Sequence, residues 1–459
     1  MIYVWQTNIS RKRRYRQRGI NLKRKKLLYG TLLYISFLIV LAAVMILPSF
    51  AVSDIPDMSA AKAVYLYNVE QNRVMAQKNA DISVYPASTV KLMTGIVAIE
   101  NLSGRLSETI TVTEKMLAGV VGNNIKLKAG EKVTVLDMLY GTLCGGANDC
   151  ASVLAHTVSG GIEPFVELMN QKAVLLGALD THYTNVSGMH DSAMVTTAYD
   201  TFLIAKAASE IQLFVEIASE SRYQMPKTNL SEDRNVYNKN YLISRYSETK
   251  YYNRYAKGLN SGFTSQGGYC LATCTEKDSQ TYICVVMGAD ERDGDIFSYT
   301  IANDLIDWAY SSYGYLEVLS SDRLVCEVSV DLSEDVDYVT LRPAHSLTLF
   351  LPLDIDIEKD LVYSHKVTSP KIEAPVREGQ VAGFITVEYD GEVLGSVDLI
   401  AMNSVERSEF LYALKRIRDF TTTRGFIATV ITFVILLVVY VFGMAVYRTK
   451  PANRRRRRR

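Results

Sequence analysis

The chain has 459 residues, of which 48% are hydrophobic and 22% are charged. This length and composition exclude a largely disordered protein and provide enough apolar residues for more than one folded core. The formal net charge of +1 averages three different regions. Residues 1–26 contain ten Lys or Arg and residues 448–459 contain eight, whereas the region between them has 32 basic and 49 acidic residues, a net charge of about −17.

An apolar stretch without charged residues lies next to each basic end, at residues 27–47 and 425–447. Each stretch is long enough to cross a bilayer as a helix. Because cytoplasmic segments carry the excess of Lys and Arg, we predict that both ends are cytoplasmic. Residues 54–420 are then expected on the outer side of the cell membrane.

The fate of the first span depends on Ser49-Phe50-Ala51, which offers a small-x-small cleavage site. Residues 27–52 therefore form either a retained signal anchor or a cleaved signal peptide. The second span anchors the protein in both cases. The arginine run at residues 454–459 is interpreted as a stop-transfer signal beside that span, and no nucleic-acid binding is expected.

The first predicted folded elements are a hairpin and a helix. Residues 63–68 and 73–76 flank a polar turn and predict a β-hairpin. Pro86 and Ala87 come before residues 91–100, in which apolar side chains recur at helical spacing. Ser88 is therefore predicted at the beginning of a helix.

More helices and strands follow and complete an α+β domain, in which helices pack against an antiparallel sheet. These elements are predicted helices over residues 134–154, interrupted at Gly145-Gly146, over residues 162–176 and over residues 296–310, and predicted strands over residues 268–275 and 280–288.

The sequence changes at about residue 315 to short alternating strands, and this pattern continues to residue 402. Residues 325–330 and 383–389 are examples, and the turn Asp390-Gly391 follows the second of them. The pattern predicts a small all-β domain. Residues 405–421 then form a charged, amphipathic helix, which we interpret as a stalk leading to the second span.

Six cysteines occur at spacings that match neither a disulfide-dense scaffold nor a zinc site. Most of them stand where small hydrophobic residues would fit, so we predict buried thiols and no metal site. They are Cys144, Cys150, Cys270, Cys274, Cys284 and Cys326.

The segment Ser88-Thr89-Val90-Lys91 places a hydroxyl and an amine three residues apart. On a helix these two residues share one face, so the Lys91 amine can reach Ser88 Oγ beside the helix N-terminus. A serine hydroxyl is a weak nucleophile and needs such a base. Lys91 can accept its proton at neutral pH only if burial or another cation lowers its pKa. A Ser-x-x-Lys pair also arises by chance, so its context decides its meaning.

A Ser-His-Asp triad is the alternative machinery, with His156, His182 and His190 as candidate bases. No strand-bounded Gly-x-Ser-x-Gly segment accompanies these histidines. We therefore interpret them as structural residues.

The stretch Tyr85-Pro86-Ala87-Ser88-Thr89-Val90-Lys91-Leu92-Met93-Thr94 resembles the nucleophile segment of the low-molecular-mass penicillin-binding proteins, the D-alanyl-D-alanine carboxypeptidases of peptidase S11 type. The resemblance covers roughly residues 58–400. It implies an α+β serine domain of the β-lactamase/transpeptidase type, followed by the small all-β domain. Other segments that agree include Lys128-Ala129-Gly130-Glu131, Ala147-Asn148-Asp149, Asn185-Val186-Ser187-Gly188 and Val285-Val286-Met287-Gly288.

Three motifs surround the cleft in this family: Ser-x-x-Lys, Ser-x-Asn and Lys-Thr-Gly. The second aligns with Gly146-Ala147-Asn148, which keeps the asparagine that would orient Lys91 and the substrate amide but lacks the serine hydroxyl. The third aligns with Asn260-Ser261-Gly262, so a neutral amide replaces the cation. The resemblance then implies weaker carboxylate binding, a raised Lys91 pKa and impaired proton delivery to the leaving D-alanine.

Two other cations are considered as replacements for the missing one. Lys257 lies three residues before Asn260, so the two side chains point to opposite faces unless Gly258 forms a bulge. Arg292 stands where the family has a carboxylate-binding arginine, but acidic residues surround it in the sequence. We interpret its segment as a solvated acidic loop.

The resemblance implies a serine-type D-alanyl-D-alanine carboxypeptidase that trims peptidoglycan stem peptides through an acyl-Ser88 intermediate. Backbone N–H groups of Ser88 and of the strand near Phe263 would form the oxyanion hole. β-Lactams are expected as acylating inhibitors, the membrane as a partner, and no metal or organic cofactor. The implied catalytic residues are Ser88, Lys91 and Asn148, and the implied substrate-binding residues are Asn260, Ser261, Gly262 and Phe263.

Two other functions remain open at this point. An inactive relative would keep the fold as a peptidoglycan or partner-binding module, which the two changed motifs favour. A β-lactamase would need a dedicated water-activating group for deacylation, and the sequence identifies none. The β domain and the membrane stalk favour work on the cell wall over the β-lactamase.

The predicted organisation has seven parts in chain order. They are a basic cytoplasmic segment (1–26), a signal anchor or signal peptide (27–52), the serine domain (56–312), the small β domain (315–402), the amphipathic stalk helix (404–421), a transmembrane helix (425–447) and a basic cytoplasmic tail (448–459).

Overall fold

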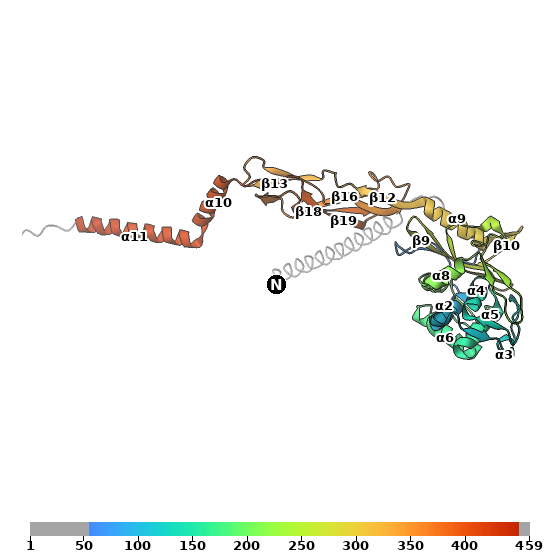
Figure 1. Ribbon diagram of the computed structural model, residues 1–459. Coiled ribbons are helices and arrows are strands. Elements are labelled where there is room, and N and C mark those ends of the chain that lie inside the picture. Colours follow the sequence, from blue (N-terminus) through green and yellow to red (C-terminus); the bar gives the residue numbers. More distant parts are fainter. Residues whose placement is uncertain (1–54, 449–459) are drawn as a thin grey trace, which may run out of the picture. The chain divides into compact units, whose positions relative to one another are not determined.

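The computed structural model describes residues 55–448 (Figure 1). The predicted basic segment at residues 1–26, the first predicted span at residues 27–52 and the arginine run at residues 454–459 lie outside the described residues.

A five-stranded antiparallel sheet forms the centre of the first domain, in the order β2-β1-β9-β8-β7. The predicted hairpin is confirmed, because β1 pairs with β2 from Val64–Lys78 to Asn68–Arg73. Strand β1 also pairs with β9 along its whole length, so the first and last parts of this domain share one sheet. The strands are β1 (Ala63–Asn68), β2 (Arg73–Lys78), β7 (Ala256–Thr264), β8 (Gly268–Lys277) and β9 (Gln280–Ala289).

Both faces of this sheet are covered, as the nearly continuous apolar sequence of β9 requires. Successive strand residues point to opposite faces. Tyr282 in β9 meets the ring of Tyr310 in helix α9 (Phe297–Ser312), with 4.8 Å between ring centroids. On the other face Tyr65 in β1 packs against Phe202 in α7 (Ala198–Ser209).

The helical layer surrounds α2, which begins two residues after Ser88. Nearly every residue of α2 is buried, including all of the first ten, so this helix is a core element. The predicted interruption at Gly145-Gly146 is confirmed, since α4 ends at Leu143 and α5 begins at Asn148. The helices of this layer are α2 (Val90–Leu102), α4 (Val135–Leu143), α5 (Asn148–Ser159), α6 (Ile162–Leu175), α7 and α8 (Gln212–Ser219).

Two buried acidic residues fix the loops around the start of α5. Asp149 accepts hydrogen bonds from the backbone N–H groups of Ile125 and Leu127. Glu131 is fully buried and receives two hydrogen bonds from Arg234, of 2.7 and 3.0 Å. Burial alone would raise the Glu131 pKa, but the hydrogen bonds from Arg234 and Thr228 lower it. The carboxylate therefore ties the β5–β6 hairpin (Arg222–Met225 and Arg234–Tyr237) to the rest of the serine domain.

The second domain is all β and has its own apolar core. Its main sheet has the order β16-β18-β19-β14-β13-β17, and β12 pairs with β15 beside it. The predicted turn is confirmed, because Asp390 and Gly391 both have positive φ and connect β18 to β19. The strands are β12 (Tyr313–Leu319), β13 (Cys326–Asp331), β14 (Tyr338–Pro343), β15 (Leu347–Pro352), β16 (Leu361–Val367), β17 (Lys371–Glu373), β18 (Val381–Tyr389) and β19 (Glu392–Ala401).

Two helices end the described chain: α10 (Glu409–Thr422) and α11 (Arg424–Arg448). The predicted stalk helix begins later than expected, because Val405 still bridges to Val376 in the β domain and Ser408 caps the helix. Within residues 55–448 one helical stretch, Arg424–Ala445, is long and apolar enough to cross a membrane, with a mean hydropathy of 2.7.

All six cysteines are free, and five of them are buried. The prediction that most are buried thiols is confirmed. Burial raises the pKa of Cys284 to about 12, which keeps this thiol protonated and unreactive at neutral pH.

Candidate active site

Ser88 lies in a single 3₁₀ turn, Ala87–Thr89, that continues directly into α2. Its predicted place at a helix start is confirmed. The Lys91 side-chain nitrogen, Nζ, lies 3.2 Å from Ser88 Oγ. The i, i+3 spacing therefore produces the contact that a nucleophile and its base require.

Lys91 is fully buried, which is unusual for a lysine. Burial lowers the pKa of its amine to about 7, because the charged form loses its hydration. Nζ also donates a 2.6 Å hydrogen bond to the carbonyl oxygen of Ser187. A substantial fraction of the amine is therefore neutral at pH 7, held in place, and able to take a proton from Ser88.

The backbone around Ser88 is strained and very closely packed. Ala87 has φ of +48°, a left-handed conformation that costs a non-glycine residue roughly 1–2 kcal/mol. A Cβ atom on Gly262 would lie 2.4 Å from Ser88 Cβ and 2.5 Å from its backbone nitrogen. A Cβ atom on Gly188 would lie 1.9 Å from the Ala87 carbonyl oxygen. Both neighbouring segments can approach Ser88 and Ala87 this closely only because these residues are glycines.

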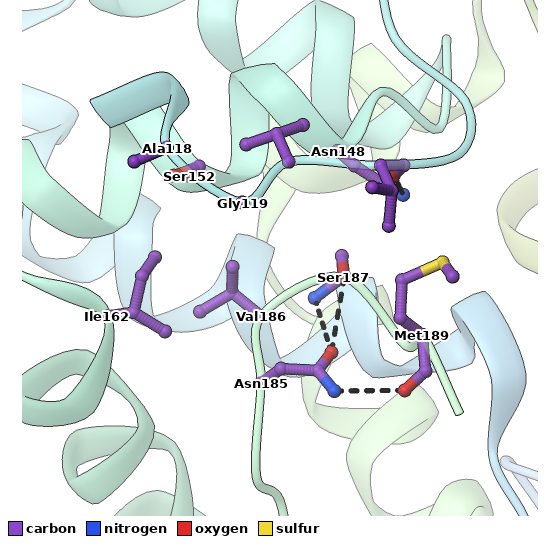
Figure 2. Close-up of a pocket in the computed structure, with 11 residues that line it drawn as sticks. Ala118, Gly119, Asn148, Ser152, Ile162, Asn185, Val186, Ser187 and Met189 are labelled. Atoms are coloured by element: carbon purple, nitrogen blue, oxygen red, sulfur yellow. Dashed lines mark hydrogen bonds between the residues drawn. The ribbon is translucent and has the colours of Figure 1, made fainter. Parts of the chain in front are cut away.

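The loop that carries the Ser187 carbonyl is fixed by Asn185, as Figure 2 shows. Asn185 Oδ1 accepts hydrogen bonds from the Ser187 backbone N–H and hydroxyl, and its amide nitrogen donates to the Met189 carbonyl oxygen at 2.9 Å. The segment from Asn185 to Gly188, one of those that carry the family resemblance, thus has a physical role. It presents a carbonyl oxygen to Lys91.

Asn148 is the first residue of α5 and is buried. Its amide nitrogen donates to the Val121 carbonyl oxygen at 2.7 Å, and its Oδ1 has no hydrogen-bond partner in the described structure. It lines a mostly apolar pocket of about 190 Å³, opposite Val186 and Met189 (Figure 2). Asn148 is not among the lining residues of the pocket that opens at Ser88.

The strand β7 carries the third motif. Asn260 is buried, and its Oδ1 has no partner among residues 55–448. Ser261 Oγ donates to the carbonyl oxygen of Lys239 at 3.0 Å. The Phe263 side chain is 54% exposed and packs on Tyr269, with ring centroids 4.4 Å apart.

The two cations considered as replacements lie elsewhere. A register shift does occur around Gly258, but Lys257 Nζ pairs with Glu276 at 3.4 Å and does not line the cleft. Arg292 is exposed and pairs with Asp290 at 2.6 Å, as expected of a solvated acidic loop. The side-chain hydrogen bond of Ser88 goes to Lys91 and not to a histidine.

A second pocket of about 320 Å³ opens directly at Ser88, and its lining includes residues of all three aligned segments, among them Gly146 and Ser261. It also contains residues that the sequence reasoning missed, of which Lys239 is the one charged side chain in the described lining. No local sequence pattern marks Lys239, which reaches this pocket from a loop whose flanking residues, Asn238 and Asn240, are both buried. The missed lining residues are Asn123, Lys239, Tyr241, Tyr269, Cys270, Ser298 and Tyr299.

A buried lysine amine beside an accessible serine, on an α+β fold with a central antiparallel sheet, defines the class of serine acyl-transfer enzymes that use a lysine base. Within residues 55–448 no group of three or more His, Cys, Asp or Glu is arranged to hold a metal.

Residues 50–291 match the model of the D-alanyl-D-alanine carboxypeptidase family, which covers more than half of the chain. The chain belongs to this family. Residues 313–407 match the C-terminal domain of penicillin-binding protein 5.

Curated and solved relatives agree with this assignment. The D-alanyl-D-alanine carboxypeptidase DacF of Bacillus subtilis is 27% identical over 363 residues, which are 78% of this chain and 88% of that protein. A D-alanyl-D-alanine carboxypeptidase structure from Mycobacterium tuberculosis is 26% identical, with a TM-score of 0.51, over 57% of this chain and 94% of that one. Penicillin-binding protein 6B of Escherichia coli shares the fold at 21% identity and a TM-score of 0.56, over 77% and 98%.

Proposed function

We propose that this protein is a serine-type D-alanyl-D-alanine carboxypeptidase that acts on peptidoglycan stem peptides through an acyl-Ser88 intermediate. The observation that carries the proposal is the 3.2 Å contact between Ser88 Oγ and a fully buried Lys91. Family membership supplies the substrate class.

In the acylation step, Ser88 Oγ attacks the carbonyl carbon of the penultimate D-alanine while Lys91 Nζ takes the hydroxyl proton. The C–N bond to the terminal D-alanine then breaks, and the departing nitrogen takes up a proton delivered by Lys91. Water next attacks the acyl ester, so the shortened peptide leaves and the Ser88 hydroxyl is restored. The depressed Lys91 pKa suits an amine that must accept and return a proton near neutral pH.

The developing oxyanion would be stabilised by the backbone N–H groups of Ser88 and Phe263. The close approach of Gly262 to the Ser88 backbone supports this assignment, because it brings β7 to the serine amide. Asn148 would use its unpartnered Oδ1 to hold the substrate amide or the charged form of Lys91. Ser261 and Asn260 would contact the leaving residue.

The two altered motifs lower the expected turnover. Gly146 supplies no hydroxyl to relay the proton to the leaving group, and Asn260 supplies no charge. Acylation depends on Ser88 and Lys91, so we expect it to persist while turnover of the peptide is slow. β-Lactams would acylate the same serine.

We also propose that the protein is an envelope protein with its C-terminus in the cytoplasm and its N-terminal segment either cytoplasmic or removed with a cleaved signal peptide. The apolar stretch Arg424–Ala445 and the basic residues flanking it support this orientation. The serine and β domains would then face the peptidoglycan.

Fluorescent penicillin labelling of the full chain in detergent tests the proposal. The unchanged chain should be labelled and Ser88→Ala should not, while Ser187→Ala, which keeps the Ser187 carbonyl oxygen that receives Lys91, serves as the control. Absence of Ser88-dependent label at high drug concentration would instead favour the inactive binding module.

A further inference from the structure

A third pocket, of about 250 Å³, lies outside the active site, where the end of α8 and the segment 243–254 meet the start of β7. It shares no described lining residue with the pocket at Ser88. Its volume corresponds to roughly eight water molecules at about 30 Å³ each, which is enough room for a small amino acid. The pocket is therefore a separate site, with a size that suits a small polar group.

The charged side chains of this pocket have both signs but are not paired with one another. Arg245, Arg254 and Glu220 are exposed residues of its lining. None of the three forms an ion pair within residues 55–448. Because an ion pair needs its N and O atoms within about 4 Å, the pocket keeps the opposite charges apart. Groups of both signs are therefore available to a ligand between them.

Tyrosine side chains hold both guanidinium groups in place. Arg245 donates a 3.0 Å hydrogen bond to the Tyr252 hydroxyl, and its guanidinium carbon lies 5.3 Å from the centre of that ring. Arg254 donates to the Tyr255 hydroxyl, and its guanidinium carbon lies 4.7 Å from that ring centre. Each arginine thus uses one of its N–H donors in these bonds. The remaining donors suit a carboxylate, which a guanidinium binds through two parallel hydrogen bonds.

The chain segments around the pocket are fixed to one another by backbone hydrogen bonds. The Arg245 backbone N–H donates to Ser221 Oγ at 3.0 Å, which joins the segment 243–254 to the residues after α8. Ser219 Oγ donates to the Lys257 carbonyl oxygen at 3.0 Å, which joins the end of α8 to β7. Ser221 gives its own hydroxyl proton to no acceptor in the described structure. The charged groups are therefore in position before a ligand arrives, and the Ser221 hydroxyl adds a donor beside them.

We propose that this pocket binds the α-amino acid group of a ligand, in which an ammonium and a carboxylate are attached to one carbon. Glu220 binds the ammonium. Arg245 and Arg254 bind the carboxylate, and the Ser221 hydroxyl donates to it. A ligand with both charges satisfies the groups of both signs, whereas Glu220 would repel a purely anionic ligand such as phosphate.

Two sources present this chemical group to a protein that works on the cell wall. One is the free D-alanine that the proposed carboxypeptidase reaction releases, and this source rests on the proposed function. The other is a diamino acid of a peptidoglycan stem peptide, whose second amino and carboxyl groups are both free. The pocket lies at the start of β7, and the same strand brings Gly262 against Ser88 near its other end. A ligand in this pocket is therefore held on the strand that borders the active site, away from the reacting atoms.

Titration calorimetry of the Ser88→Ala full chain in detergent tests this site without turnover. The probes are D-alanine, N-acetyl-D-alanine, which lacks the ammonium, and D-alanine amide, which lacks the carboxylate. D-Alanine should bind about 10- to 100-fold more tightly than either analogue, the range for a hydrogen bond to a charged group. Glu220→Gln should weaken D-alanine binding by a similar factor without weakening that of N-acetyl-D-alanine. Arg254→Met should weaken D-alanine binding without weakening that of the amide.

Arg292→Met is the matched control, because it removes an exposed arginine that pairs with Asp290 outside this pocket. It should leave every dissociation constant unchanged. A second titration separates the two sources, with a stem peptide that contains the diamino acid and with the same peptide containing lysine in its place. Tighter binding of the diamino acid peptide than of D-alanine identifies the stem peptide as the ligand, and the reverse order identifies the free amino acid.

Two results would overturn the inference. One is the absence of binding of both D-alanine and the diamino acid peptide at millimolar concentration. The other is binding that neither Glu220→Gln nor Arg254→Met weakens. Penicillin labelling of Ser88 in the unchanged chain decides the proposed enzymatic function separately, so the two failures are distinguishable.

Discussion

The two sides of the cleft differ in how completely their polar groups are satisfied. On the side of Ser88, Lys91 is buried and bonded to both Ser88 and Ser187, next to a strained backbone at Ala87. On the opposite side, Asn260 and Ser298 have buried polar atoms without partners in the described structure. Ser88 and Lys91 therefore have partners within the chain, whereas the other side has polar groups that a ligand would satisfy.

The largest expected effect is a loss of acylation rate when Lys91, the proposed base, is replaced. Lys91→Arg should reduce penicillin acylation by about 10²–10⁴-fold, because a guanidinium does not give up its proton. Stopped-flow or gel-based acylation rates measure this effect. Lys257→Arg is the control, and a Lys91→Arg chain that retains its rate would remove Lys91 from the proposed mechanism.

A substitution at Gly262 tests the close approach of β7 to Ser88. Gly262→Ala should lower acylation by about 10²–10³-fold, because the new methyl group would displace β7 from the proposed oxyanion hole. The acylation rate constant at saturating drug is the measurement. Gly104→Ala should leave the rate unchanged, because a Cβ atom added at Gly104 would have no other atom within 4 Å.

Restoring the family residues at positions 146 and 260 tests whether the two altered motifs limit turnover. Gly146→Ser with Asn260→Lys should raise D-alanine release from a D-Ala-D-Ala peptide by about tenfold, as charge and hydroxyl return. Gly146 has φ of +64°, so the serine also lowers the free energy of unfolding by roughly 1–2 kcal/mol. Gly160→Ser, at φ of +80° and in open space, is the control for that strain. Unchanged D-alanine release would refute the explanation of the altered motifs.

The last expected effect is on stability and not on a reaction rate. The Lys91 pKa is about 7 in the folded chain and 10.5 as its ordinary value, so the unfolded state binds more protons between these pH values. The free energy of unfolding of the serine domain should therefore rise with pH across this window, by up to about 1.4 kcal/mol per unit from this group. Below pH 7 the contribution is constant. Lys91→Met should remove the rise in denaturant titrations, and an identical pH profile would contradict the burial of a neutral amine.

Features set by neighbouring residues were predictable from the sequence. The helix start at Ser88, the interruption before Asn148 and the turn at Asp390-Gly391 follow from local periodicity and turn chemistry. The alternating pattern after residue 315 likewise predicted the β domain.

Features that depend on distant contacts were not predictable in this way. The pairing of β1 with β9 joins segments more than two hundred residues apart, and no local pattern specifies it. The hairpin β5–β6 is short and polar, so the alternation of apolar and polar residues that would predict its strands is weak. Lys239 reaches the cleft only because buried asparagines fix its loop against Cys144 and β7. The burial that lowers the Lys91 pKa also comes from the assembled helical layer.

Mass spectrometry of the full chain after reaction with a penicillin, over a series of pH values, tests the central claim most directly. The structure predicts one adduct on the peptide that contains Ser88, formed at a rate that rises with pH around an apparent pKa of about 7. No adduct, or an adduct on another residue, would contradict the assignment of Ser88 and Lys91 as the acylating pair.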